Sequence, residues 1–227
     1  MDELQAPFFD PQMAARYSDG PARMVPGLAS LHQMTALLLA ERSPENARVL
    51  VLGAGGGLEL KALAAAQPLW TFDGVDPAQA MLDEAIRVLG PLSDRTHLHC
   101  GYIDDAPRGP FDAATCLLTL HFLAPDERRR TLAALHGRLK PGAPFVAAHC
   151  SFPQQRGERQ RWLSRYIAFG VASGMDPGQA DLIRERVDRS LQILEPDADE
   201  AILREAGFHD VQMFYAAFSW RGWVAYA

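Results

Sequence analysis

Three glycines in the stretch VLVLGAGGGLEL, residues 49–60, could bring a ligand against bare backbone. Gly53, Gly55 and Gly57 follow an apolar run and precede a helix-like stretch. Glycine is costly to order, so several together indicate a tight turn or a close approach that side chains would block. Asp76 ends a second apolar run, where a carboxylate can accept hydrogen bonds from ribose hydroxyls. These residues predict a site for a ligand that carries a nucleoside.

The spacing of the glycines favours one class of nucleoside ligand over another. Dinucleotide-binding loops read G-x-G-x-x-G, and the helix that follows receives a pyrophosphate at its N-terminus. Here the glycines spell G-x-G-x-G, Leu58 stands where the third fingerprint glycine would fall, and Glu59 adds a negative charge to the first helical turn. That charge suits the helix dipole but not a pyrophosphate. S-adenosylmethionine (SAM) carries no phosphate and therefore fits this loop better.

Short apolar runs alternate with helical patterns between residues 48 and 150. This alternation predicts a parallel sheet with helices on both faces, because strands buried in that way read as near-continuous apolar runs. In such sheets ligands bind at the carboxyl ends of the strands, where the glycine loop and Asp76 both fall. We expect strands at 48–53, 70–76, 96–102, 111–120 and 143–150, and helices at 57–66, 77–89 and 125–139.

The remaining segments add helices and a final pair of strands. Apolar spacing predicts a helix over 28–42, inside an N-terminal helical cap of residues 1–46. Residues 151–195 contain helical stretches without an obvious strand and form an insert after the fifth strand. The chain closes with two strands over 209–227, which we expect to pair as a β-hairpin. We interpret 1–227 as a single domain.

Composition narrows the classes of function. The net charge of −6 and a pI of about 5.6 do not favour nonspecific binding to nucleic acid or membranes. The number of cysteines, three, is odd and none lies in a CxxC pair, so we expect neither a disulfide framework nor a metal site. The N-terminus does not resemble a signal peptide, and no apolar run approaches the roughly 20 residues that span a bilayer. A cytoplasmic location is the natural expectation.

Ordered motifs in the sequence resemble those of class I SAM-dependent methyltransferases. They are VLVLGAGGGLEL, FDGVDPAQAMLDEA, FDAATCLLTLHFL and LKPGAPFVAAH, and the likeness spans about residues 47–150 with the closing hairpin in addition. The resemblance implies a Rossmann-like α/β sandwich whose seven-stranded sheet has the order 3-2-1-4-5-7-6. It also implies a helical insert after strand 5, a C-terminal β-hairpin, and SAM as the cofactor, bound over strands 1 to 4.

The same resemblance implies a cofactor site spread over several strand ends. The glycine loop should line the methionine arm of SAM, the acidic strand end should hold the ribose, and the residues after it should border the adenine. Tyr102 stands where relatives commonly place an acidic residue against the adenine amine, so ring stacking and the Ile103 backbone would recognise the base. Val51 stands where many relatives have an Asp or Glu that helps to anchor the amino end of SAM. The expected cofactor-binding residues are Gly53, Ala54, Gly55, Gly57, Asp76, Pro77, Met81, Tyr102, Ile103 and Leu118.

Few residues qualify as catalytic groups for methyl transfer. Transfer from a sulfonium is an in-line displacement on an activated donor, so the enzyme chiefly aligns the reactants and removes water. A general base is needed only when the acceptor must lose a proton. His121, at the end of strand 4, and His149, at the end of strand 5, are the candidates, each against the alternative of a structural histidine. Cys116 reads as a small buried residue, and the run DERRR at 126–130 as a solvated helix face.

The ends of the chain narrow the resemblance to the carboxy-S-adenosylmethionine synthase branch. The stretches concerned are FFDPQMAARYSDGPARMVPGL, TLHFLAPDERRRTLAALHGRLKPG and LREAGFHDVQMFYAAFSWRGWVAYA. That branch uses prephenate to convert SAM into its carboxylated form for tRNA wobble-uridine modification. It holds the added carboxylate with an arginine in the helical insert, followed by Leu-Glu-Asn. Here the region reads RERVDRSLQIL, in which Arg186 is the best match, Arg189 the second, and the Leu-Glu-Asn stretch is absent.

Two further substrate candidates lie near the N-terminus. In this fold family the N-terminal segment often closes over the cofactor, which favours Tyr17 and Arg23 as substrate-binding residues beside Arg186. The insert at 151–195 should lie above the fifth strand. It either covers the pocket of a small molecule as a lid or forms the interface of a homodimer.

The leading hypothesis is a SAM-dependent methyltransferase that acts on an unidentified small molecule. One alternative is a carboxy-S-adenosylmethionine synthase-like enzyme that uses SAM and prephenate, and another is a non-catalytic SAM-binding protein. A nicotinamide dehydrogenase is disfavoured by Leu58 and by the absence of evident hydride-transfer residues.

Overall fold

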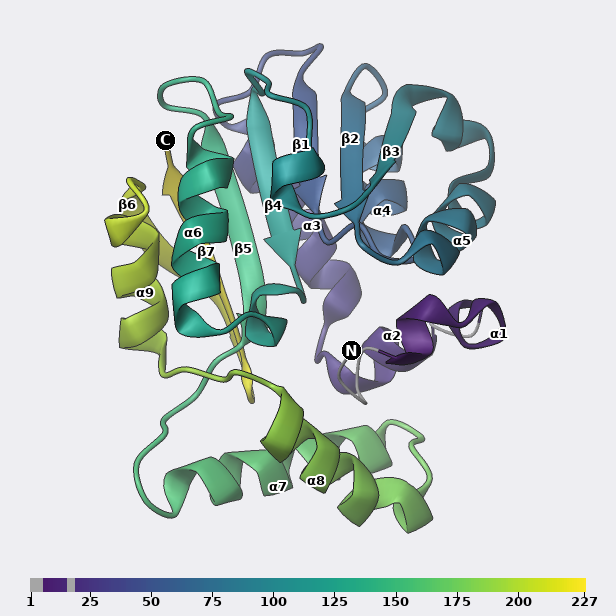
Figure 1. The fold of residues 1–227 in the computed structure, drawn as a ribbon, viewed down its shortest axis with the longest axis vertical. Coiled ribbons are helices and arrows are strands. Elements are labelled where there is room, and N and C mark those ends of the chain that lie inside the picture. The colour runs from purple at the N-terminus through teal and green to yellow at the C-terminus, as the bar shows by residue number, and fades with distance from the viewer. Residues whose placement is uncertain (1–5, 16–18) are drawn as a thin grey trace.

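The computed structural model describes residues 6–15 and 19–227, and its centre is one mixed sheet (Figure 1). The sheet has seven strands in the order β3-β2-β1-β4-β5-β7-β6, which confirms the predicted order and with it the Rossmann-like class. The strands are β1 (Arg48–Leu52), β2 (Thr71–Asp76), β3 (Thr96–Cys100), β4 (Ala113–Leu117), β5 (Pro144–Cys150), β6 (His209–Ala217) and β7 (Trp220–Tyr226).

The first five strands are parallel, and the last two form an antiparallel hairpin at the edge. β1 pairs with β2 and β4, β2 with β3, and β4 with β5, all in parallel. β7 runs antiparallel to both β5 and β6, as the hairpin prediction requires. Every residue of β4 and β5 is buried, because helices cover both faces of the central strands.

Helices pack on both faces of the sheet, and each face has its own hydrophobic core. On one face the core contains side chains of α3 (Leu28–Ala40), α4 (Leu58–Ala66) and α5 (Gln79–Leu89). On the other it contains side chains of α6 (Pro125–His136) and α9 (Pro196–Glu205). In Figure 1 α6 and α9 lie in front of the sheet, and α3 and α4 lie behind it.

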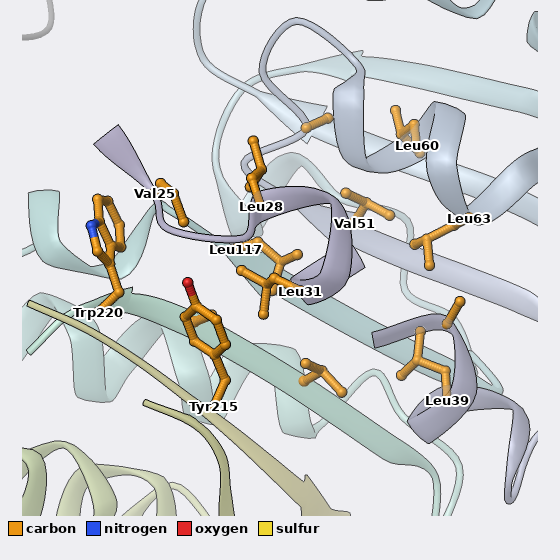
Figure 2. Close-up of a cluster of buried hydrophobic side chains, with 14 of the residues drawn as sticks. Val25, Leu28, Leu31, Leu39, Val51, Leu60, Leu63, Leu117, Tyr215 and Trp220 are labelled. Carbon is orange, nitrogen blue, oxygen red and sulfur yellow. The ribbon is translucent and has the colours of Figure 1, made fainter. Parts of the chain in front are cut away.

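The core on the α3 face joins the N-terminal region to the hairpin. Figure 2 shows Leu31 of α3 and Leu60 of α4 in the same cluster as Tyr215 and Trp220 of the hairpin. The Trp220 indole N–H donates to the Met24 carbonyl at 2.9 Å, and the Tyr215 hydroxyl donates to the Pro26 carbonyl. These contacts fix the segment before α3 against the end of the chain.

The N-terminal short helices and the insert lie beyond the carboxyl ends of the strands (Figure 1). The N-terminal elements are a 3-10 helix, η1 (Ala6–Phe9), α1 (Pro11–Ala14) and α2 (Asp19–Met24). The insert contains α7 (Glu158–Ala172) and α8 (Ala180–Ser190). Further 3-10 helices are η2 (Gly90–Arg95), η3 (Ile103–Asp105), η4 (Leu120–Phe122) and η5 (Pro177–Gln179).

The insert is anchored to the N-terminal region rather than extended into solvent. Gly170 of α7 lies against Met24, where an added Cβ would approach the methionine sulfur to 2.7 Å. Leu163 of α7 is fully buried, and Trp162 stacks on Phe152 with the ring centroids 6.2 Å apart. Among the described residues, no helix has both the length and the apolar character needed to cross a membrane.

Candidate active site

The glycine loop after β1 is shaped by backbone conformation and by its own neighbours. Gly53, Gly55 and Gly57 have φ angles of +77°, +48° and +80°, which side-chain-bearing residues rarely adopt. A Cβ on Gly53 would lie 2.0 Å from the Thr119 hydroxyl oxygen, and one on Gly57 would lie 2.8 Å from Cα of Ala85. The loop therefore requires glycine even before a ligand is considered.

Asp76, the last residue of β2, is hydrogen-bonded to that loop. Its Oδ2 accepts a hydrogen bond from the Gly55 N–H at 2.9 Å, and its Oδ1 accepts one from the Ala78 N–H at 3.0 Å. Burial raises the pKa of Asp76, and the two backbone donors oppose that rise. Each carboxylate oxygen keeps a lone pair for a further donor, so the side chain can still receive a vicinal diol.

A cleft opens between these strand ends and the N-terminal 3-10 helix. The space between the lining atoms is about 940 Å³, including the open mouth of the cleft. Phe8 of η1 meets Phe122 edge to face across it, with the centroids 5.9 Å apart. The lining also includes Phe9, Leu52, Val75, Ala78, Gly101, Leu117, Thr119, Leu123, Glu127 and Thr131.

Most residues expected to bind the cofactor line this cleft. They are Gly53, Gly55, Asp76, Pro77, Met81, Tyr102, Ile103 and Leu118. Met81 and Ile103 are almost fully buried in its wall, whereas Tyr102 is 59% exposed at the rim. Ala54 lines a second cavity on the other side of the loop, and Gly57 caps α4 outside both cavities.

Leu118 marks the point where β4 ends at the site. Its φ of +57° is unusual for a branched side chain and costs of order 1–3 kcal/mol. The Leu118 N–H donates to the Ala148 carbonyl at 2.6 Å, which holds the residue in this conformation. Leu118 lines both the cleft and the second cavity and so separates the two spaces.

The second cavity lies between the glycine loop and the start of α3. It encloses about 360 Å³, and Gly53, Gly55, Leu117 and Leu118 line it as well as the cleft. Its other lining residues are Pro21, Leu28, His32, Ala54, Gly56, Leu58 and Glu59. The two cavities therefore share the loop as a common wall.

Both titratable side chains of this second cavity are shifted towards their neutral forms. Burial raises the pKa of Glu59 to about 8, because water no longer solvates its charged form. Burial lowers the pKa of His32 to about 4 for the same reason. At neutral pH the cavity thus holds a largely protonated carboxyl group and an uncharged imidazole.

His121, predicted as a catalytic base, lies behind the cleft wall. It is buried, and its Nδ1 accepts a hydrogen bond from the Cys150 N–H at 3.2 Å. Its ring packs against Phe122 and Trp220, with centroid separations of 4.5 and 5.6 Å. Burial, with the neighbouring His149, holds the pKa of His121 well below its usual value. His121 is not among the lining residues of the cleft.

His149, the other predicted base, belongs to a buried ion cluster between β5, α6 and α9. Its Nε2 is 3.1 Å from Asp199 Oδ1, and Arg128 forms an ion pair with the same carboxylate. Arg128 also donates to the Gln192 carbonyl at 2.7 Å. Despite burial, His149 and Arg128 hold the pKa of Asp199 below its ordinary value. We call Arg128, His149 and Asp199 the buried ion cluster.

The buried ion cluster corrects one expectation about the charge run DERRR. Arg129 and Arg130 lie on a solvated helix face, as predicted, and pair with neighbouring acidic groups. Arg128 does not, because it faces Asp199 across α6 and α9 and is 0% exposed. Cys116 is buried as expected, and burial raises the pKa of its thiol.

Of the predicted substrate-binding residues that the structure describes, neither Arg23 nor Arg186 lines the cleft or the second cavity. Tyr17 lies outside the described residues. Arg23 is exposed on α2, and its guanidinium reaches the Gly174 carbonyl at 3.5 Å. Arg186 is half-buried on α8, and its buried Nε makes no hydrogen bond with the described residues. Within the described chain, no group of His, Cys, Asp and Glu side chains is arranged to hold a metal ion.

The site contains residues that the sequence did not indicate. Phe8 and Phe9 reach the cleft because the first segment folds back over the strand ends, which no local pattern reveals. Thr119 could have been found, since it lies within the fourth-strand motif FDAATCLLTLHFL. Glu59 and His32 come together only through the packing of α3 beside α4.

Comparison with known proteins agrees with this geometry. Residues 50–145 match the profile of a methyltransferase domain. A carboxy-S-adenosyl-L-methionine synthase from Chromohalobacter salexigens is 28% identical over 222 residues, which cover 96% of this chain and 82% of that protein.

Solved methyltransferases share the fold at low sequence identity. A putative O-methyltransferase from Nostoc punctiforme aligns with a TM-score of 0.68 and 19% identity, over 95% of this chain and 60% of that one. Human N-acetylserotonin methyltransferase, solved in complex with SAM, aligns with a TM-score of 0.63 and 14% identity, over 98% of this chain and 58% of that one. The chain thus spans about 60% of the length of these structures. The methyltransferase-domain match, the strand order and the glycine-lined cleft are those of class I SAM-dependent methyltransferases.

Proposed function

We propose that the chain transfers a methyl group from SAM to a small molecule bound in the same cleft. The observation that carries this proposal is the hydrogen bond from the Gly55 N–H to Asp76, which joins the glycine loop to the end of β2 inside the cleft. SAM supplies an electrophilic methyl group on a sulfonium. The chain supplies binding, alignment and protection from water.

Each part of the cleft suits one part of the donor. Asp76 offers two carboxylate oxygens to the ribose hydroxyls. Met81 and Ile103 offer a buried apolar wall to the adenine, and Tyr102 offers a ring at the rim. The bare backbone of Gly53 leads from there towards the methionine arm.

The acceptor side of the cleft is apolar and aromatic. Phe8, Phe9, Phe122 and Leu123 line it, and these side chains exclude water from the reacting groups. His121 has no place in that lining, so we propose an acceptor whose nucleophile needs no histidine base. Its role in this proposal is to hold η4 against β5 through the Cys150 N–H.

We further propose that α7 and α8 act within each single chain and do not form the interface of a homodimer. Leu163 and Ile167 of α7 are buried within this chain, so the apolar face of α7 is already covered. That disfavours the alternative in which the same face binds a second copy. A nucleic-acid partner is disfavoured because Arg129 and Arg130, the exposed cations of the charge run, are paired with acidic side chains.

Formation of carboxy-SAM is a second candidate, supported by a synthase relative that aligns over 96% of the chain. That reaction needs a cationic group for the added carboxylate, and neither Arg23 nor Arg186 lines the cleft. Mass spectrometry of the product from SAM and prephenate separates the two candidates. A carboxylated adduct would favour the synthase reaction, and SAM recovered unchanged would favour methyl transfer to another acceptor.

Binding of SAM, followed by titration calorimetry, tests the proposed site. We expect micromolar affinity for the wild-type chain and a loss of at least about 100-fold in Asp76→Ala, since two hydrogen bonds to a carboxylate are worth roughly 1.5–3 kcal/mol each. Asp83→Ala is the matched control, because Asp83 is exposed on neighbouring α5. Equal affinities in wild type and Asp76→Ala would refute the assignment.

A further inference from the structure

Glu59 is buried at a position where a carboxyl group destabilises the fold unless a ligand contacts it. It is the second residue of α4 and only 7% exposed. Its Oε1 is fully buried and forms no hydrogen bond with the described residues. A buried polar atom without a partner costs about 1–3 kcal/mol. The Thr115 hydroxyl beside the carboxyl offsets part of that cost, but burial still raises the Glu59 pKa.

The groups that face Glu59 leave its carboxyl without a cation. His32, from α3, lines the same cavity but is kept neutral by burial. Cys116, from β4, adds a thiol whose ionisation the buried carboxyl opposes, and the Thr115 hydroxyl lies beside it as a neutral group. A cationic ligand in this cavity would therefore meet an acceptor and no competing charge.

The second cavity adjoins the place proposed for the adenosyl group. Gly53, Gly55 and Leu118 line both spaces, so a ligand that lies along the loop in the cleft would enter the second cavity past Leu118. The part of SAM that extends beyond its sulfur is an amino-acid end with an α-ammonium and an α-carboxylate. Val51, at the buried strand position before the loop, is 0% exposed and offers no acceptor.

We propose that Glu59 is a specificity-determining residue that accepts hydrogen bonds from the α-ammonium of SAM in the second cavity. This inference rests on the proposed function, because it needs the adenosyl group in the adjoining cleft. The carboxylate end meets the first turn of α4, where Gly57 is the N-cap and no side chain caps the helix. The ligand thereby contacts a buried carboxyl group and a helix terminus that the fold leaves open.

Binding at this subsite is coupled to a proton. The free chain keeps the Glu59 carboxyl largely protonated at pH 7, because its pKa is about 8. A bound ammonium stabilises the ionised form and lowers that pKa. Ligand binding at pH 7 therefore releases close to one proton from Glu59.

Two nucleosides separate the amino-acid end from the rest of the ligand. S-adenosylhomocysteine (SAH) carries both the ammonium and the carboxylate, and methylthioadenosine carries neither. We expect Glu59→Gln to weaken SAH binding by tenfold or more while methylthioadenosine binds within twofold of wild type. Glu84→Gln is the matched control, because Glu84 is also buried but pairs with Arg87 on α5. It should leave both affinities within twofold.

Calorimetry of SAH binding in phosphate and in Tris at pH 7 gives an independent readout. Wild type should release close to one proton on binding, and Glu59→Gln should release almost none. Unchanged SAH affinity in Glu59→Gln, or equal losses for both nucleosides, would overturn this inference and leave the proposed function intact. Failure of the wild-type chain to bind either nucleoside would instead overturn the proposed function, and this inference with it.

Discussion

The two halves of the sheet's carboxyl edge differ in how they hold buried charge. Beside β5, the buried ion cluster pairs a cation with an anion, since Arg128 meets Asp199 and the Gln192 carbonyl, although Arg128 Nε and Asp199 Oδ2 have no hydrogen-bond partner among the described residues. Beside β1, Glu59 Oε1 is buried without a partner, next to a cavity. One region is closed on itself and stabilises the packing of α6 and α9. The other is left open, which is what a ligand site requires.

The largest expected effect is a loss of stability caused by a substitution in the buried ion cluster, the closed half. Arg128→Met leaves the Asp199 carboxylate buried without its cation, which costs about 3–5 kcal/mol of unfolding free energy. Arg129→Met, whose side chain is 45% exposed and pairs only at the surface, should cost less than about 1 kcal/mol. Urea unfolding of both variants measures the difference. Similar costs would show that the ion cluster is not a distinct stabilising unit.

The open half should make stability depend on pH. The folded chain keeps the Glu59 proton up to a pH of about 8, whereas a solvated glutamate has a pKa of 4.5. Between these values the folded state binds more protons than the unfolded state, so stability falls as pH rises, by at most about 1.4 kcal/mol per pH unit. Urea unfolding between pH 5 and 8 should show this fall in wild type and a smaller one in Glu59→Gln. Parallel curves would contradict the raised pKa.

The glycine loop gives an intermediate effect with a close control. Gly53→Ala places a Cβ 2.0 Å from the Thr119 hydroxyl at a φ of +77°, whereas Gly142→Ala meets a similar φ of +75° in open space. The left-handed conformation alone costs about 1–2 kcal/mol. We expect Gly142→Ala to lose that amount and to bind SAH normally. Gly53→Ala should lose more stability and at least tenfold in affinity. If the two variants lost the same stability and the same SAH affinity, the glycine loop would not be part of the binding site.

The smallest expected effect is at the rim of the cleft. Tyr102 is 59% exposed, so its ring adds little until an adenine lies against it. Tyr102→Ala should weaken SAH binding about fivefold, the equivalent of roughly 1 kcal/mol for a lost stacking contact. Tyr102→Phe keeps the ring and should match wild type in the same titration. A large loss in the phenylalanine variant would assign recognition to the hydroxyl instead.

The sequence predicted the open half better than the closed one. The strand order followed from ordered motifs, and the glycine loop and Asp76 are adjacent to those motifs along the chain. Local sequence is enough to place these residues, because the carboxyl ends of parallel strands meet at one edge of the sheet regardless of how the other segments pack. Most of the predicted cofactor-binding residues accordingly line the cleft.

The closed half depends on contacts between distant segments. Arg128 and Asp199 are 71 residues apart, and nothing in the run DERRR distinguishes its buried arginine from its exposed ones. The positions of His121 and Glu59 have the same origin. The side chain of His121 turns into the packing under Trp220, and Glu59 is covered by the helix that precedes β1. Local spacing indicates which residues stand near a strand end, but tertiary packing decides which of them reach the ligand.

A crystal structure of the chain grown with SAH tests the central claim most directly. The account predicts the nucleoside in the cleft, with its ribose hydroxyls within hydrogen-bond distance of the Asp76 carboxylate and its methionine-derived arm along Gly53 and Gly55. A ligand bound elsewhere on the chain, or a cleft that stays empty at saturating nucleoside, would contradict it.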